Sequence, residues 1–252
     1  MYLIALKIST FRNIRENLSF LIPAIIDGKF SKCQLFCVTR YATDIITAWI
    51  KDQLKKLQTL VPSSILIEKL TGDNTRAEKE RVMELFRGNS KMVLVCTDVA
   101  GMGLDVQDLN FAINIGIPKN SWKIQQQTGR IGRSGERSVS ITLAYSQKGK
   151  LAPEPVLRDV FKQEGCIRRK INDLFTLTDP LKDYSAVSED VTCSEVCREL
   201  EQNCDCSMCR CCSNCSSLCP CSNKDDNETL ENILGFGDEN YRLVQYKFVW
   251  SY

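Results

Sequence analysis

The stretch Lys91–Asp105 reads KMVLVCTDVAGMGLD, and its two halves differ in character. The first half, Lys91–Cys96, is a continuous apolar run of strand length, which is the pattern of a buried strand in a parallel sheet. The polar pair Thr97-Asp98 follows directly, ahead of a turn with two glycines. Open α/β sheets bind ligands outside the carboxyl ends of their strands. The stretch therefore predicts a strand that leads into a binding site.

The sequence on both sides of this strand alternates between strand and helix patterns. Further strands are predicted at Gln34–Val38, Ser64–Ile67, Phe111–Ile115 and Val139–Leu143. Helices are predicted at Tyr41–Leu60, at Thr75–Phe86 and around Trp122–Gln127. Thr75 followed by Glu78 three residues later is the pattern of a capping box. Such alternation predicts an α/β lobe with a mostly parallel sheet and helices on both faces.

Composition divides the chain into four segments. Residues 1–30 are predicted to be an N-terminal connector, and residues 31–150 form the α/β lobe. Residues 151–222 start with a helical pattern over 153–178, which Gly165 divides into two helices, and continue as polar, cysteine-rich sequence. Residues 223–252 are predicted to be an acidic linker and tail.

Charge is distributed unevenly along the chain. The net charge of +2 combines +3 in residues 1–118, +8 in residues 119–170 and −9 in residues 171–252. The basic middle block is therefore the part expected to meet phosphate groups. The sequence contains no histidine. This excludes Ser-His-Asp and Cys-His nucleophile systems and any zinc site with histidine ligands.

Cysteines are concentrated in the C-terminal half, with 11 of the 14 lying between Cys166 and Cys221. They could form disulfides in an oxidising compartment or bind metal in a reducing one. Residues 1–8 show no basic leader or cleavage site, and no apolar run has the roughly 20 residues of a membrane span. We therefore expect a soluble intracellular protein without a membrane partner, and metal ligation rather than disulfides.

A second dense motif, Gln126–Gly135, reads QQTGRIGRSG. Its glycines permit a tight backbone path, and the guanidinium groups of Arg130 and Arg133 can project towards one phosphate. Two more polar pairs follow predicted strands, namely Thr39-Arg40 and Thr71-Gly72. These pairs and Thr97-Asp98 are expected to share one edge of the sheet.

The order of these motifs resembles the second RecA-like lobe of superfamily 2 helicases, a P-loop NTPase-like fold, over residues 33 to about 215. Within that superfamily the sequence looks most like the RecQ DNA helicases. Gln126 stands where DEAD-box RNA helicases carry histidine, Gly101–Gly103 reads GMG, and Cys166 precedes two arginines. Ser134 departs from the aspartate that is usual in RecQ proteins.

The resemblance implies a role for each motif. Arg130 and Arg133 would meet the γ-phosphate of ATP, bound with magnesium, and Gln126 would couple the nucleotide state to the lobe position. Gly103 and Asp105 would approach the ribose of the nucleotide. The residues implied to contact the phosphate backbone of a single strand are Arg40, Thr71, Gly72 and Thr97.

RecQ proteins also carry a zinc-binding region after the second lobe, so the resemblance implies a small helical, cysteine-rich zinc site. The implied ligands are Cys166, Cys197, Cys212 and Cys215. Cys193 is an alternative to Cys197, and Cys206-x-x-Cys209 is a rival for the final pair. Four thiolates suffice for one structural zinc ion. Ten cysteines in residues 193–221 leave a second metal open.

The activity implied by the resemblance is ATP-dependent unwinding of duplex DNA, with 3′ to 5′ movement on single-stranded DNA, in nuclear DNA repair and recombination. The chain contains neither a Walker A motif of the form GxxxxGK[ST] nor a DEAD-like box. We therefore expect ATP hydrolysis to need a first RecA-like lobe, from a longer parent chain or a partner. The alternatives are a non-catalytic nucleic-acid- or metal-binding remnant and a lobe of an RNA helicase.

Overall fold

A six-stranded parallel sheet forms the centre of the computed structural model, which describes residues 2–28, 32–57, 65–89, 91–101, 106, 109–132, 138–162 and 166–175. The strands are β1 (Tyr2–Lys7), β2 (Lys32–Cys37), β3 (Leu66–Leu70), β4 (Met92–Cys96), β5 (Leu109–Ile115) and β6 (Val139–Ala144). Their order across the sheet is β1-β6-β5-β2-β4-β3, and every neighbouring pair is parallel. The predicted parallel α/β lobe is thus confirmed.

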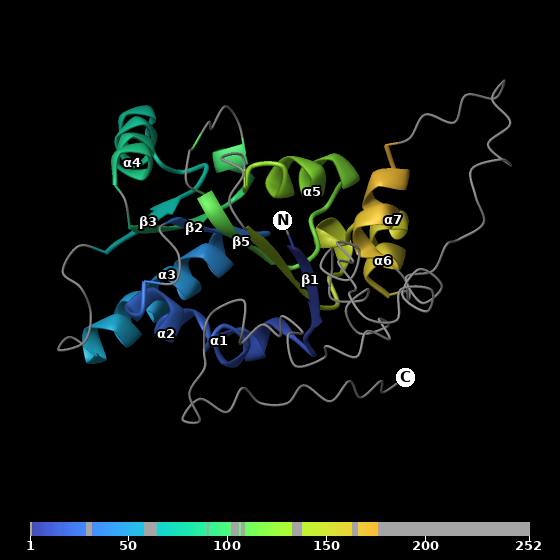
Figure 1. Ribbon diagram of the computed structural model, residues 1–252, viewed down its shortest axis with the longest axis horizontal. Helices are drawn as coiled ribbons and strands as arrows, with labels where there is room; N and C mark the ends of the chain where they lie inside the picture. Colours follow the sequence, from blue (N-terminus) through green and yellow to red (C-terminus); the bar gives the residue numbers. More distant parts are fainter. Residues whose placement is uncertain are drawn as a thin grey trace, which may run out of the picture.

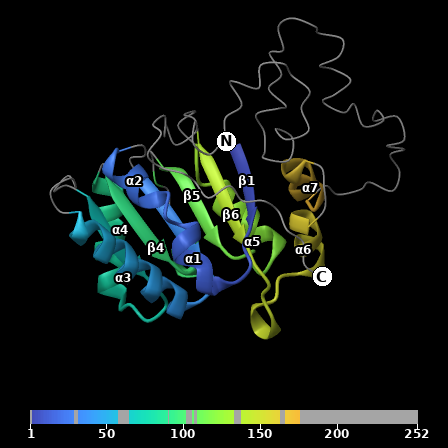
Figure 2. The same ribbon diagram turned by 90° about the horizontal axis from the view of Figure 1, so that it is seen from below.

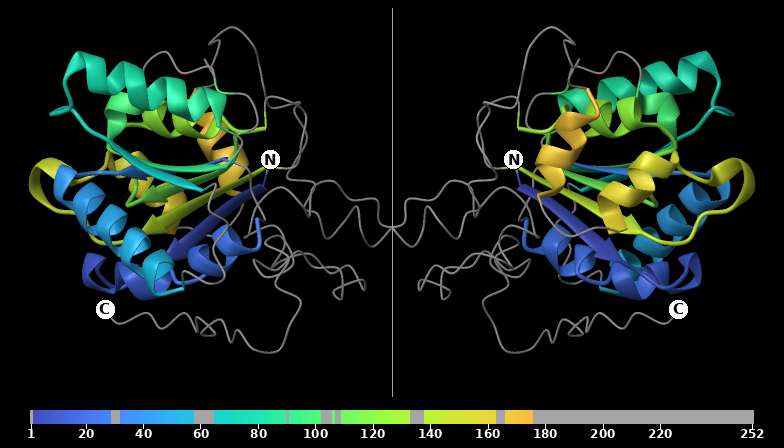
Figure 3. Two further views of the ribbon diagram at one scale, coloured as in Figure 1. Left: turned by 90° about the vertical axis from the view of Figure 1, so that its left-hand side faces the viewer. Right: turned by 90° about the vertical axis from the view of Figure 1, so that its right-hand side faces the viewer.

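Helices cover both faces of this sheet (Figures 1 and 3). The α-helices are α1 (Ile14–Asn17), α2 (Leu21–Ile26), α3 (Arg40–Lys56), α4 (Arg76–Gly88), α5 (Ser121–Thr128), α6 (Pro155–Lys162) and α7 (Ile167–Asp173), and the 3₁₀ turns are η1 (Phe11–Asn13), η2 (Asp98–Gly101) and η3 (Gly149–Leu151). Helices α1, α2 and α3 share one hydrophobic cluster with the sheet, whereas α4 packs on the other face. Within the described ranges, no helix is both long enough and apolar enough to cross a membrane.

Helix α3 shows why the apolar spacing predicted a helix there. Ile46, Ile50 and Leu54 are all buried, because residues three or four apart lie on the same helix face. Thr39 caps the N-terminus, its hydroxyl oxygen accepting a hydrogen bond from the Ala42 N–H at 3.1 Å. The helix ends at Lys56, four residues before the predicted end.

Strand β3 begins two residues after the predicted start at Ser64 and continues three residues past the predicted end at Ile67. It is an edge strand, so Glu68 and Lys69 reach solvent and form ion pairs with Arg81 and Asp44. Charged side chains at an edge position interrupt the apolar run. The predicted strand therefore ended at Ile67, directly before the first charged residue, Glu68.

Helix α4 starts with the predicted capping box. The Thr75 hydroxyl oxygen accepts from the Glu78 N–H at 3.3 Å, and the Glu78 carboxylate accepts from the Thr75 N–H at 2.7 Å. These bonds satisfy two of the backbone donors that a helix leaves free at its N-terminus. Val82 and Phe86 are buried against the sheet.

Within the segment 1–30, which we expected to be a connector, the described residues 2–28 contribute to the lobe itself. Strand β1 pairs with β6 along its whole length, from Tyr2 beside Val139 to Lys7 beside Ala144. Leu18 and Leu21 are fully buried in the cluster beneath α3. Strand β1 is far from its partner β6 along the sequence, and no local sequence pattern predicts a pairing between such distant segments.

Helices α6 and α7 confirm the two predicted helices, and Gly165 between them lies outside the described residues. Leu157, Phe161 and Ile171 form a cluster with Leu3 of β1 and Ile124 of α5. Figure 2 shows this helix pair beside β1, at the end of the sheet opposite α4. The start of the segment 151–222 therefore shares a core with the lobe.

Candidate functional site

The predicted polar pairs lie along the carboxyl edge of the sheet. Thr39-Arg40 follows β2, Thr71-Gly72 follows β3, and Thr97-Asp98 follows β4. Because these strands are neighbours and parallel, their ends meet at one edge. The Thr97 N–H donates to the Leu70 carbonyl oxygen at 3.1 Å, so Thr97 and Thr71 lie beside each other.

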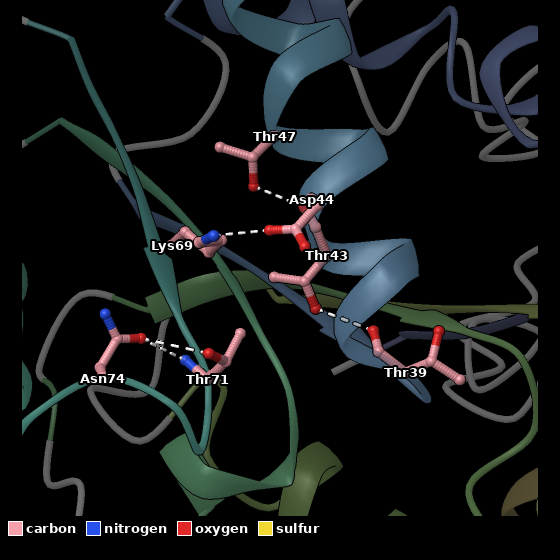
Figure 4. A network of polar contacts seen from close by, with 7 residues as sticks. All are labelled: Thr39, Thr43, Asp44, Thr47, Lys69, Thr71 and Asn74. Carbon is pink, nitrogen blue, oxygen red and sulfur yellow. Dashed lines mark hydrogen bonds and ion pairs between the residues drawn. The ribbon is translucent and has the colours of Figure 1, made fainter.

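We call the set Thr39, Arg40, Asp44, Lys69, Thr71, Asp73 and Asn74 the β2–β3 cluster. Figure 4 shows side chains of this set from α3 and its N-cap, from β3, and from the loop that follows β3. The Asn74 amide oxygen accepts from the N–H of the buried Thr71 at 2.8 Å, and Lys69 contacts Asp44 at 2.5 Å. These contacts hold the loop after β3 in a defined conformation.

Arg40 and Asp73 form an ion pair at the exposed rim of this cluster. The hydrogen bond from Arg40 is the main reason that the pKa of Asp73 lies below its ordinary value. Both side chains are about two-thirds exposed, with relative areas of 64% and 67%, so the pair is open to solvent. A phosphate group could therefore compete with Asp73 for the guanidinium group of Arg40.

Gly72 is exposed, and its carbonyl oxygen accepts from the Lys79 ammonium group at 3.0 Å. A Cβ atom at this position would meet only the Val99 side chain, at an ordinary 3.8 Å. Neither packing nor backbone conformation in the described part of the chain requires glycine here. Glycine at this position would instead allow a ligand to approach the backbone closely.

Gly129 and Gly132 of the QQTGRIGRSG motif, in contrast, are required by the fold. A Cβ atom on Gly129 would lie 2.9 Å from the Gln125 carbonyl oxygen, and Gly132 has a φ of 69°. The turn directs Arg130 back into the lobe, where only 7% of its surface is exposed. Gln126, on α5, is exposed.

Arg130 lies near the end of β4, close enough to affect the thiol of Cys96. Burial raises the pKa of Cys96 to about 12, and the positive charge of Arg130 partly opposes that rise. Cys33 and Cys37 are also buried strand residues, and burial raises the pKa of both thiols. These three cysteines are therefore core residues.

Asp98 links the turn after β4 to α5. One of its carboxylate oxygens forms an ion pair with Lys123, and the other accepts from the Gln127 amide nitrogen at 3.3 Å. The two contacts place the TDVAGMGLD motif against the helix that leads into the arginine motif. The two motifs that the sequence singled out are thus in direct contact.

Several predicted site residues lie outside the described residues. They are Gly103, Asp105, Arg133, Cys197, Cys212 and Cys215. Cys166 is described, and its sulfur accepts from the Arg169 N–H at 3.4 Å at the start of α7. The described ranges contain no group of three or more possible metal ligands. The predicted zinc site therefore stays a prediction.

The structure also shows a pocket that the sequence did not indicate, which we call the β5 pocket. It lies where β5, α5, η2 and η3 meet, and its lining includes Asn114, Lys119, Lys123, Gln127 and Lys150 together with Asp98 and Gly116. Gly116 has a φ of 96°, and a Cβ atom there would lie 2.9 Å from the Val38 side chain. The basic block 119–170 was the available signal, but it did not reveal which lysines would meet.

Residues 19–135 match the helicase conserved C-terminal domain family. A similar protein is the ATP-dependent RNA helicase FAL1 of Chaetomium globosum, which is 31% identical over 126 residues, covering 50% of this chain and 28% of that protein. Another is the ATP-dependent RNA helicase ROK1 of Meyerozyma guilliermondii, 32% identical over 107 residues, or 42% and 20% of the two chains. The matched region thus spans less than a third of each relative.

Two solved structures share the fold. Domain 2 of the DEAD-box helicase Mss116p, bound to an RNA duplex, has a TM-score of 0.50 and 20% identity over 57% of this chain and 54% of its own. The DUF1998 helicase MrfA, bound to DNA and AMPPNP, has a TM-score of 0.50 and 19% identity over 68% and 22%. The relatives named above are RNA helicases, so they do not support the narrower resemblance to RecQ DNA helicases. The described part of the chain therefore has the single parallel-sheet α/β fold of a RecA-like helicase C-terminal lobe.

Proposed function

We propose that this chain supplies the C-terminal motor lobe of an ATP-dependent helicase that acts on RNA. The observation that carries the proposal is the match of residues 19–135 to the helicase C-terminal domain, with its polar motifs along one sheet edge. The relatives FAL1 and ROK1 are named RNA helicases, which favours RNA as the substrate. The first RecA-like lobe would come from the same parent protein or from a partner.

The lobe would provide positive charge for phosphoryl transfer. ATP with magnesium would supply the phosphoryl group and part of the charge that stabilises its transfer. Arg130 and Arg133 would face the γ-phosphate across the cleft between the lobes, with Gly103 and Asp105 near the ribose. Because Arg130 is buried, its guanidinium group is held in place before the lobes close.

Thr71, Gly72, Thr97 and Arg40 would hold the sugar–phosphate backbone of the strand. Gly72 leaves its backbone open to a close approach, and the Arg40 guanidinium group can exchange Asp73 for a phosphate. Contacts of this kind position a strand without reading its sequence. The cluster therefore suits translocation along any sequence.

A DNA substrate is the second candidate, because Gln126 and the GMG of Gly101–Gly103 favoured a RecQ-like helicase. The 3′ to 5′ direction, the nuclear location and the role in DNA repair all depend on this candidate. Binding of RNA and DNA strands of identical sequence separates the two substrates. Tighter binding of the DNA strand would contradict the proposal for RNA.

The central experiment combines this chain with the first RecA-like lobe of an RNA helicase and measures ATP turnover with RNA. Arg130→Ala is expected to lower turnover by roughly 10³-fold or more, the range known for arginine fingers. Arg158→Ala, on the exposed side of α6, is the matched control and is expected to keep normal turnover. Thermal melting shows whether each variant is folded, and equal rates for folded Arg130→Ala and the control would refute the assignment.

The chain alone is expected to bind RNA without hydrolysing ATP. Adding the first lobe distinguishes a motor lobe from a non-catalytic remnant, because a motor lobe would then hydrolyse ATP and a remnant would not.

Zinc binding through Cys166, Cys197, Cys212 and Cys215 is proposed on sequence resemblance. Elemental analysis of the purified protein tests it, and absence of bound zinc would remove it.

A further inference from the structure

The β5 pocket is the part of the carboxyl edge that the proposed function leaves unused. It is a cavity of about 90 Å³ beside Asp98, between the end of β5, the start of α5 and η3. Pockets that enclose a drug-sized molecule measure roughly 300–1,000 Å³. The β5 pocket therefore suits one group of a larger ligand whose remainder lies on the surface.

Lysines determine the charge of this pocket. Lys119, Lys123 and Lys150 line it, and Asp98 is the carboxylate among its lining residues. Asp98 is paired with Lys123, while Lys119 and Lys150 have no ion-pair partner within the described ranges. The excess of positive charge favours an anionic group such as phosphate.

Two buried amide side chains add a second requirement. Asn114 and Gln127 line the pocket at 1% and 4% exposure, and in the described part of the chain neither amide oxygen has a hydrogen-bond partner. The Gln127 amide nitrogen donates to Asp98, which can only accept, so its oxygen is the unused atom. Buried acceptors without donors destabilise a fold. A ligand that carries a hydroxyl donor as well as an anion would match this pocket.

Trp122 adds a third feature at the rim. Its side chain is 52% exposed, and the ammonium group of Lys123 lies 5.6 Å from the centre of its ring. Because Lys123 also lines the pocket, the indole ring lies close to the pocket. Exposed aromatic rings beside cationic grooves are platforms on which the bases of single strands stack.

A ribonucleotide unit has all three matching groups, namely a phosphate, a hydroxyl donor and a flat base. The geometry points to a second strand contact, in which the β5 pocket takes the ribose of one nucleotide of single-stranded RNA, while the phosphate lies against the lysines of the pocket and the base stacks on Trp122. The lysines meet the phosphate, and the 2′-hydroxyl donates to the amide oxygen of Gln127 or Asn114. The contact rests on the proposed function, and it makes the lobe prefer RNA to DNA.

The position of the pocket fits a continuous strand path. The carboxyl ends of β3, β4, β2 and β5 follow one another along the edge, and three strand spacings amount to roughly 14 Å. A strand that crosses Thr71, Thr97 and Arg40 therefore reaches Gly116 at the pocket. The β2–β3 cluster holds the backbone, and the pocket adds recognition of the sugar.

Fluorescence anisotropy with the full chain tests the contact, using labelled oligouridylate RNA and the deoxyuridine oligomer of equal length. Trp122→Ala is expected to weaken binding of both strands about tenfold, and Trp122→Phe is expected to restore most of the loss. Gln127→Met is expected to reduce RNA affinity to that for DNA and to leave DNA affinity unchanged. Lys150→Gln is expected to lower the slope of log affinity against log salt by roughly 0.7.

Lys148→Gln is the matched control, because Lys148 is exposed on the same loop but does not line the pocket. Binding of neither strand by the unaltered chain would refute the proposed function itself. Binding that Arg40→Ala weakens but Trp122→Ala and Lys150→Gln leave intact would refute the pocket contact alone. AMP binding that Gln127→Met abolishes, with RNA affinity unchanged, would assign the pocket to a free nucleotide and overturn the strand contact.

Discussion

The two halves of the carboxyl edge satisfy their polar groups in different ways. In the β2–β3 cluster, polar side chains bind one another: Asn74 accepts from Thr71, and Arg40 pairs with Asp73. In the β5 pocket, the amide oxygens of Asn114 and Gln127 have no partner among the described residues, and lysines outnumber carboxylates. Buried polar groups are normally paired, so unpaired ones need an explanation. The polar groups of the cluster are therefore satisfied within the fold even before a strand binds, whereas the pocket keeps buried acceptors that a ligand could satisfy.

The largest effect on stability is expected where a paired group is lost. Asn74→Ala removes the oxygen that accepts the hydrogen bond from the Thr71 N–H, and Thr71 is only 5% exposed. A buried donor without a partner costs about 1–3 kcal/mol, and we expect the free energy of unfolding to fall by that amount. Urea unfolding followed by circular dichroism measures the difference.

Asn74→Asp is the control for this prediction. It keeps an oxygen that can accept from the Thr71 N–H and the Thr71 hydroxyl, at the positions now 2.8 and 3.3 Å away. We expect its unfolding midpoint to stay close to that of the unaltered chain. If both variants unfold at the same urea concentration, the Thr71–Asn74 contact does not hold the loop.

The cluster side of the lobe also predicts a pH dependence. The pKa of Glu78 lies below its ordinary value, mainly because the Thr75 backbone N–H bonds to the carboxylate. A lowered pKa means that the carboxylate stabilises the fold above its ordinary pKa of about 4.3, and that this contribution is lost as pH falls through the lowered value. Glu78→Gln is therefore expected to be less stable than the unaltered chain at pH 7, and this difference is expected to shrink as the pH falls below the ordinary pKa of Glu78. A difference that is independent of pH would contradict this origin.

Much of the fold could be predicted from the sequence, because local patterns determine it. The apolar run of β4, the helical spacing of α3 and the capping box at Thr75 all lie within short windows. Strand β1 was missed, since its pairing with β6 joins the two ends of the lobe. The end of β3 was missed because charged residues occupy an edge strand.

The site divides in the same way. Thr97-Asp98 and Thr71-Gly72 could be located from the sequence, because each follows a strand and parallel strands end at one edge. The β5 pocket could not, because Asn114, Lys123 and Lys150 come from three separate segments. The lack of a partner for a buried amide oxygen also becomes visible only in three dimensions. Local patterns thus locate single motifs, and tertiary packing creates the pocket.

At Arg40, in the β2–β3 cluster, we expect a small effect on stability and a loss of RNA affinity. The Arg40–Asp73 pair is exposed, and exposed ion pairs contribute little to stability, so Arg40→Ala is expected to leave the urea midpoint almost unchanged. Its RNA affinity is expected to fall, with a salt slope lower by roughly 0.7, because one phosphate contact is lost. Lys56→Ala, which breaks the exposed pair with Asp52 at the far end of α3, is the control that keeps RNA affinity.

The smallest effect on stability is expected at Gln127, although its side chain is as buried as that of Thr71. Gln127→Met removes an amide oxygen that has no partner in the described residues and one hydrogen bond to Asp98 at 3.3 Å. Asp98 is half exposed and keeps Lys123, so it loses little, while the apolar side chain no longer places an unpaired acceptor in the interior. The two changes oppose each other, and the free energy of unfolding is expected to stay within about 0.5 kcal/mol of its original value. A loss as large as that of Asn74→Ala would show that Gln127 is kept for the fold, and the contrast between the two halves of the edge would fail.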